Sequence, residues 1–196
     1  MASSGLLVPE IGGPSVKPYQ PKGIWEAATS GRGLSKYVQD HGNDLYRRTM
    51  YTFIKRTVPP PSMLVFDASN RDQCEVKRLN TNTPLQALVM MNDPQVLEAS
   101  RVLAERTTAE VKGEEGQIQT AFRKIICRTP DSKELNVLLK YYRSSLEQAK
   151  ADPAGAAKLC NAGEYPRNTK LAQETVYALM KVIMTIYNLD EAIVRT

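Results

Sequence analysis

Apolar residues recur at spacings of three and four along the chain from position 43 onward. This spacing is typical of helices that bury one face, because residues three and four apart lie on the same side of a helix. No period of internal repetition accompanies the pattern. The sequence therefore predicts a mainly α fold, an irregular bundle of six to seven helices. The expected helices cover about 43–57, 84–92, 94–112, 118–128, 131–150 and 171–189.

Before position 43 the pattern is different. Six of the eleven glycines and four of the twelve prolines lie at positions 1–33, and residues 11–21 among them cannot form a helix. Apolar residues such as Val8, Val16 and Trp25 remain frequent enough to hold this stretch against a folded body. We therefore expect residues 1–42 to form an extended arm packed on a single helical body of residues 43–196.

Capping residues indicate where several helices begin. Thr83, Pro84 and Gln86 form the pattern of a capping box with proline at the first helical position. Asp93-Pro94 predicts an immediate restart, and Asp131 to Glu134 predicts another capping box. Residues 150–168 look like a looser connection. The segment 171–189 is apolar over much of its circumference, and we expect it at the centre of the core.

Composition excludes several classes of protein. Hydrophobic residues make up 42% and charged residues 24% of the chain, as in ordinary soluble domains, and no apolar run could span a membrane. The first residues do not resemble a secretion signal. None of the three cysteines belongs to a CxxC pair, so structural zinc, attached haem and other cofactors are not expected. Cys127 follows a helical apolar pattern, which predicts a buried thiol.

The net charge of +5 is concentrated at positions 1–60, around Arg47, Arg48, Lys55 and Arg56. Together with nearby aromatic residues, this cluster could bind nucleic acid. The alternative is that Leu45, Tyr46, Met50, Phe53 and Ile54 form a buried helical stripe with the arginines on its solvated sides. We favour this alternative, and nucleic acid is not an expected partner.

A series of motifs resembles one known family. In chain order they are Ser4-Gly5-Leu6-Leu7, Ile11-Gly12-Gly13-Pro14-Ser15-Val16, Asp44-Leu45-Tyr46-Arg47-Arg48, Phe66-Asp67, Asn82-Thr83-Pro84-Leu85-Gln86-Ala87-Leu88, Asn92-Asp93-Pro94, Arg128-Thr129-Pro130 and Asn188-Leu189-Asp190-Glu191. They resemble the planctomycete-specific C-terminal domain of large exported proteins, a domain of unknown function of the PSD-one type. The resemblance spans essentially the whole chain and corresponds to the C-terminal half of that domain.

The resemblance implies a domain truncated on its N-terminal side, from a parent protein in the periplasm or at the cell surface. Relatives carry additional modules, among them a cytochrome-c-like one, that are not present in this chain. The resemblance also implies a setting near carbohydrate metabolism, which is an argument from association. Expected partners are other domains of the parent protein, with a homodimer and carbohydrate as further candidates and no membrane.

Polar residues gather before the expected helix at 84–92, and they form the best candidate site. They are Asp67, Arg71, Asp72, Arg78, Asn82 and Gln86, with Cys74 among them. Two carboxylates could act as general acid and base, and the arginines could bind an anionic substrate. Alternatively, Asp67 pairs with Arg71 to tie an irregular connection, while Asn82 and Thr83 cap a helix. We favour the structural alternative.

Two further chemistries have weaker support. Cys74 and His41 could form a thiol nucleophile and its base, but no third residue that would orient them is evident. Asp67 and Asp72 lack the regular acidic spacing of an oxygen-ligated metal loop. We therefore expect a non-catalytic helical accessory or interaction domain. The alternative is a hydrolase-like enzyme on polysaccharide or sulfated glycan that uses Asp67, Arg71 and Asp72.

Overall fold

The computed structural model describes residues 1–25, 36–55, 57–69, 76–77 and 81–193. Helices make up 58% of it and strands 3%, and the described residues form no sheet. The prediction of a mainly helical fold is confirmed, since this part of the chain holds eight α-helices, six of them with at least seven residues. The chain divides into a helical unit, Met1–Leu6 with Ala87–Thr196, and an arm unit, Leu7–Gln86.

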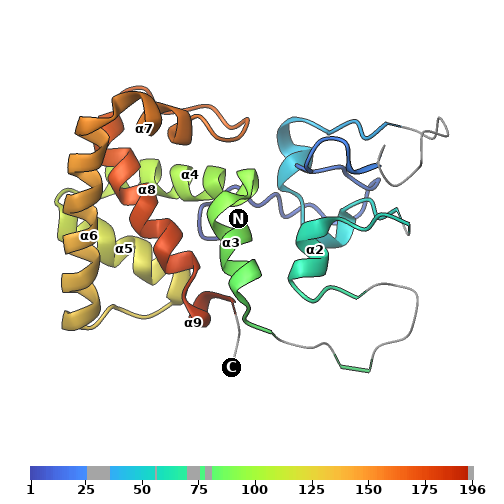
Figure 1. Ribbon diagram of the computed structural model, residues 1–196, viewed down its shortest axis with the longest axis horizontal. Helices are drawn as coiled ribbons and strands as arrows, with labels where there is room; N and C mark the ends of the chain where they lie inside the picture. Colours follow the sequence, from blue (N-terminus) through green and yellow to red (C-terminus); the bar gives the residue numbers. More distant parts are fainter. Residues whose placement is uncertain (26–35, 56, 70–75, 78–80, 194–196) are drawn as a thin grey trace. The chain divides into compact units, whose positions relative to one another are not determined.

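The helical unit is built around α8 (Gln173–Tyr187), whose apolar side chains are buried over most of its circumference. Leu179, Val182 and Ile183 are fully buried, and each such side chain stabilises the fold by about 1.5–3 kcal/mol. The expectation of a central last helix is confirmed. Figure 1 shows α8 surrounded by its neighbours, α4 (Pro94–Glu110), α5 (Glu114–Ile126), α6 (Ser132–Ala151), α7 (Pro153–Cys160) and the short α9 (Asp190–Ile193).

Aspartate N-caps begin three of these helices. Asp93 accepts a hydrogen bond from the backbone N–H of Gln95 at 2.8 Å, directly after α3 (Pro84–Asn92) ends. At α6, Asp131 accepts from the N–H of Glu134 and Glu134 accepts from the N–H of Asp131, each at 2.7 Å. The predicted restart at residue 94 and the predicted capping box at 131–134 are both confirmed.

The third aspartate cap, Asp152, begins a helix that the sequence analysis did not predict. Residues 150–168 look like a loose connection in the sequence, but α7 occupies Pro153–Cys160. Asp152 accepts from the N–H of Gly155 at 2.9 Å, and Pro153 stands at the first helical position, where its missing donor costs nothing. This Asp-Pro start repeats the chemistry of Asp93-Pro94, so the signal was present in the sequence.

Arg128 ties α9 to the turn between α5 and α6. Its guanidinium donates to both oxygens of Glu134, at 2.7 and 2.8 Å, and to both oxygens of Glu191, at 2.7 and 2.9 Å. The same guanidinium lies 4.9 Å from the centre of the Phe122 ring. The hydrogen bonds from Arg128 and the N–H of Asp131 lower the pKa of Glu134 to about 2.

The segment Met1–Leu6 belongs to the helical unit. The Ser3 hydroxyl is 2.7 Å from the hydroxyl of Tyr187 at the end of α8, and Arg106 of α4 donates to the carbonyl of Ser4 at 2.7 Å. Leu6 is buried. Contacts with residues far away in the sequence therefore fix this segment against the helices.

In the arm unit, the helix predicted over 43–57 is not present, so that prediction is wrong. Two short 3₁₀ helices, η1 (Gly42–Tyr46) and η2 (Thr49–Tyr51), stand in its place, followed by α2 (Pro61–Val65). The reason is competition for backbone groups. The carbonyl of Tyr46 accepts from the N–H of Val8 at 2.9 Å, and Val16 pairs with both Tyr51 and Phe53, at 2.8 and 2.7 Å.

The buried stripe predicted for this segment is present only in part. Leu45 and Tyr46 are buried, but Met50 is 71% exposed because the chain leaves the helical path after η1. Residues 7–42 of the expected arm therefore form one compact unit with residues 43–86, through pairing between Val8 and Arg47 and between Val16 and Thr52.

The prediction of a buried thiol at Cys127 is also wrong, because Cys127 is exposed. Cys127 follows the last residue of α5 and adopts φ = 65° and ψ = 14°, the left-handed conformation that commonly ends helices. Helical periodicity carried through residue 127 would bury the side chain, but the helix ends one residue earlier. A non-glycine residue at this position is strained.

Replacing Cys127 with glycine should relieve that strain. We expect Cys127→Gly to raise the free energy of unfolding of the helical unit by about 0.5–1 kcal/mol, since glycine adopts positive φ without a Cβ clash. Thermal or urea unfolding followed by circular dichroism measures this. Cys127→Ala is the matched control, because it removes the thiol and keeps the Cβ. Equal effects of both substitutions would contradict the explanation.

Candidate functional site

The polar segment before α3 builds a helix start. The Thr83 hydroxyl accepts from the N–H of Gln86 at 3.3 Å, and the Gln86 side-chain oxygen accepts from the N–H of Thr83 at 2.9 Å. Pro84 is the first residue of α3. The predicted capping box is therefore confirmed, and it occupies one end of the Gln86 side chain.

The other end of Gln86 is equally occupied. Its side-chain nitrogen donates to the carbonyl of Val65 at 2.8 Å and to the Thr81 hydroxyl at 3.0 Å. Gln86 is buried, with 1% of its surface exposed, so each of these hydrogen bonds satisfies a polar group away from water. A single side chain thus connects the start of α3 to the end of α2.

Asp67 completes this arrangement, which we call the Gln86 ring (Val65, Asp67, Thr81, Thr83 and Gln86). One carboxylate oxygen of Asp67 accepts from the N–H of Thr81 at 2.9 Å and from the Thr81 hydroxyl at 2.7 Å. The Gln86 ring therefore fixes residue 67 to residue 81.

The backbone and charge of Asp67 suit this role. Its φ is +55°, a left-handed conformation in which aspartate is among the better tolerated residues. The side-chain and backbone hydrogen bonds from Thr81 lower the pKa of Asp67 below its usual value. The carboxylate is therefore ionised at neutral pH and serves as a hydrogen-bond acceptor.

Of the remaining candidate residues, the structure describes Asn82 and His41 but not the others. Asn82 is exposed beside the Gln86 ring. The candidates Arg71, Asp72, Cys74 and Arg78 lie outside the described residues. His41, the proposed base for Cys74, is exposed and stands before η1 without capping it through its side chain.

Arg47 has a role that sequence reasoning missed. Its side chain is buried and donates to the carbonyls of Glu10 at 3.3 Å, Pro14 at 3.2 Å and Gly12. Its guanidinium also lies 4.1 Å from the centre of the Tyr51 ring. Arg47 is thus used to hold the glycine- and proline-rich segment. The motif Ile11-Gly12-Gly13-Pro14 was the only signal, since such a segment leaves carbonyls without helical partners.

The other basic residues of this segment that the structure describes have different surroundings. Arg48 is exposed, and the ammonium of Lys55 lies 4.7 Å from the centre of the Trp25 ring. Arg56 lies outside the described residues. Trp25 is buried against Tyr37 and Phe53, with ring centres 5.2 and 5.8 Å away. Trp25, Tyr37 and Phe53 are therefore packed together within the arm unit.

The described residues offer neither a metal cluster nor a membrane span. No group of three or more histidine, cysteine, aspartate or glutamate side chains in this part of the chain could hold a metal ion. Among the helices that the structure describes, none has the length and apolar character needed to cross a membrane.

Comparison with known proteins places the chain in one family. The family model described as "Protein of unknown function (DUF1553)", or PSD1, matches residues 1–142, and the chain belongs to this family. The match confirms the resemblance over residues 1–142, and its end falls within α6. The motif Asn188-Leu189-Asp190-Glu191 lies beyond the match. No curated protein and no solved structure matches the chain.

The pKa of Asp67 gives the Gln86 ring a testable pH dependence. Because the folded pKa is lowered, the contribution of Asp67 to stability is complete above its unfolded pKa. That contribution is lost as the pH falls through the lower folded value. We expect Asp67→Asn to lower the unfolding temperature at pH 7 and the difference from the wild type to shrink toward zero in acid.

Thermal unfolding between neutral and acidic pH measures this difference. Asp44→Asn, at an exposed aspartate in η1, is the matched control and should leave the curve near that of the wild type. A constant difference between Asp67→Asn and the wild type at every pH would show that the charge of Asp67 does not stabilise the ring.

Proposed function

We propose that this chain is a non-catalytic helical accessory or interaction domain of a multidomain bacterial protein. The observation that supports it is the Gln86 ring. Asp67 and Gln86 are two of the candidate site residues that the structure describes, and both bind neighbouring side chains and backbone. Polar groups engaged in this way connect residue 67 to residue 81 and start a helix, which is a structural use of the signature.

The hydrolase alternative has less support from the described residues. A general acid must hold a proton near neutral pH, which requires a raised pKa, whereas the hydrogen bonds from Thr81 lower that of Asp67. The other two residues of that alternative, Arg71 and Asp72, lie outside the described residues.

An activity assay separates the two functions. The chain is incubated with a panel of neutral and sulfated polysaccharides, and released reducing ends and sulfate are measured. We expect no turnover by the wild type. Turnover that Asp67→Asn abolishes, with circular dichroism showing a retained fold, would overturn the proposal in favour of the hydrolase.

We also propose that the parent protein is exported, to the periplasm or the cell surface, and works near carbohydrate metabolism. Membership of the family supports this proposal, because the resemblance on which it rests implies an exported parent. Fractionation of the source bacterium, with antibodies against this chain, tests the location.

The interaction role has a candidate surface on α3. Leu88 and Met91, both in the helical unit, lie three positions apart and are 57% and 51% exposed. Neighbouring exposed apolar side chains of this size are typical of surfaces that bind another protein. We propose a second copy of the chain as the partner, because pairing of α3 with its own copy would cover the same residues in both.

Light scattering coupled to size exclusion tests self-association. We expect the mass of a dimer at high protein concentration and a monomer for Leu88→Glu, since a buried charge would oppose pairing. The matched control is Val137→Glu, which introduces the same charge at a 67% exposed valine on α6 and should leave the dimer intact. A monomeric wild type at every concentration would contradict this partner.

A further inference from the structure

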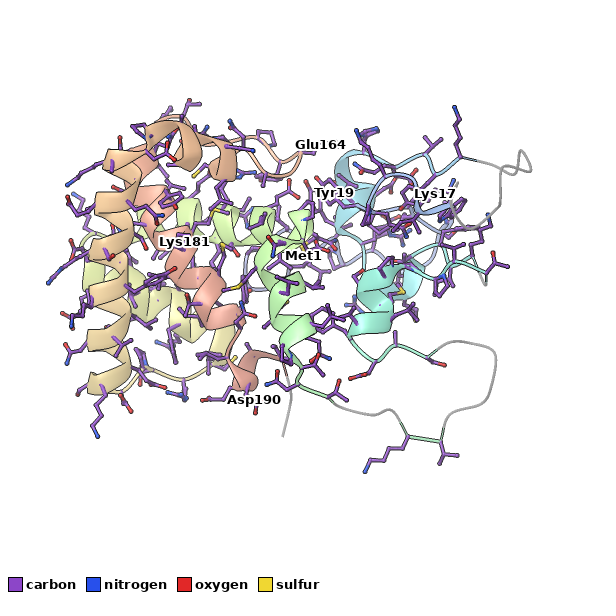
Figure 2. The ribbon with its side chains drawn as sticks, in the orientation of Figure 1. Met1, Lys17, Tyr19, Glu164, Lys181 and Asp190 are labelled. Atoms are coloured by element: carbon purple, nitrogen blue, oxygen red, sulfur yellow. The ribbon has the colours of Figure 1, made fainter. Side chains whose placement is uncertain are left out.

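A cavity of about 430 Å³ opens between α4 and the loop that follows α7. Figure 2 labels Glu164 in this loop, immediately before the residues that line the cavity. Val102 and Ala109 of α4 form its apolar floor, and Tyr165 and Pro166 form an apolar wall. The polar lining residues are Glu105 and Arg106 from α4 and Arg167 and Asn168 from the loop. A volume of this size suits a small molecule.

The two arginines in this cavity are held by neutral groups. Arg106 donates to the carbonyl of Ser4 at 2.7 Å and to the Tyr165 hydroxyl at 3.4 Å. Arg167 donates to the side-chain oxygen of Asn161 at 2.8 Å and to that of Gln173 at 3.3 Å. Within the described part of the chain, neither guanidinium forms an ion pair with a carboxylate.

Other arginines of the helical unit, unlike Arg106 and Arg167, form ion pairs with carboxylates. Arg128 and Arg143 pair with glutamates at 2.7 and 3.0 Å. The one carboxylate in the cavity lining, Glu105, is bound by Arg101 at 3.0 Å, and Arg101 is not part of the lining. Arg101 therefore pairs with Glu105, and among the described residues no carboxylate forms an ion pair with Arg106 or Arg167 at the cavity.

The wall of the cavity is fixed before any ligand arrives. The buried carboxylate of Glu98 accepts from the N–H of Tyr165 at 2.5 Å, and Arg101 donates to the carbonyl of Tyr165 at 2.6 Å. Gly163 makes this approach possible, because a Cβ there would overlap the carboxyl group of Glu98. Gly5 likewise leaves room for Arg106, whose guanidinium would overlap an added Cβ.

We propose that this cavity is a binding site for a small organic anion, a carboxylate or a phosphate ester. Its oxyanion binds Arg106 and Arg167, because guanidinium groups form strong, directional hydrogen bonds with such oxygens. The organic part of the ligand lies against Tyr165, Pro166 and the apolar floor. The site lies wholly within the helical unit and shares no residue with the Gln86 ring or with the proposed surface on α3.

Nuclear magnetic resonance titration of the full chain tests the site. The probes are phenyl phosphate and benzoate, with benzamide as the neutral counterpart of benzoate. We expect at least one anion to shift the amide resonances of Arg106, Tyr165, Arg167 and Asn168 saturably, and benzamide to leave them unchanged. A preference for phenyl phosphate would identify the ligand class as phosphate esters, and a preference for benzoate would identify it as carboxylates. The affinity should fall as salt is added, because ions screen the attraction.

Two substitutions sharpen the test. Arg167→Gln should weaken binding roughly tenfold, the effect of losing one charge-assisted contact. Arg143→Gln is the matched control, since Arg143 is exposed on α6 and pairs with Glu114, and it should bind as the wild type does. Absence of saturable shifts with both anions would overturn the proposal. So would equal binding of benzamide, or unchanged affinity in a folded Arg167→Gln variant. If that variant does not fold, the map of shifted wild-type resonances decides.

Discussion

A helix that is apolar around most of its circumference requires other helices on nearly every side, and α8 imposes this requirement on the helical unit. Met180, Ile183 and Ile186 are completely buried, and together with their neighbours they occupy the centre that α4, α5, α6 and α7 enclose. The hydrophobic effect therefore determines the arrangement of this unit. The aspartate caps at positions 93, 131 and 152 then determine where α4, α6 and α7 begin.

Helix α4 meets this requirement with polar as well as apolar residues. Its buried side chains include Glu98, Arg101 and Glu105, which would be costly in the interior without partners. Each has one: Glu98 and Arg101 bind the backbone of Tyr165, and Arg101 binds Glu105. The result is a loop after α7 that is attached to the core by charge-assisted hydrogen bonds, which gives the cavity beside it a defined wall.

Local chemistry explains which parts of the structure the sequence could predict. The capping box of Thr83 and Gln86, the restart at Asp93 and the central position of α8 depend on residues close together in the chain, and all three predictions were correct. The helix expected over 43–57 was wrong because its backbone pairs with Val8 and Val16, which lie far away in the sequence. The same limit applies to the site. Gln86 was recognised from its neighbours, whereas its bond to the carbonyl of Val65 and the cavity between α4 and the loop depend on tertiary contacts.

The family match and the folded unit have different boundaries. The match stops at residue 142, within α6, while α8 begins only at Gln173. A protein ended at residue 142 would therefore expose the faces of α4, α5 and α6 that α8 covers, including Ile118, Phe122 and Leu138. Such a fragment would aggregate when expressed. The smallest piece of this helical unit suited to crystallisation or biochemical work has to extend through Tyr187, and through Glu191 to retain the ion pair with Arg128.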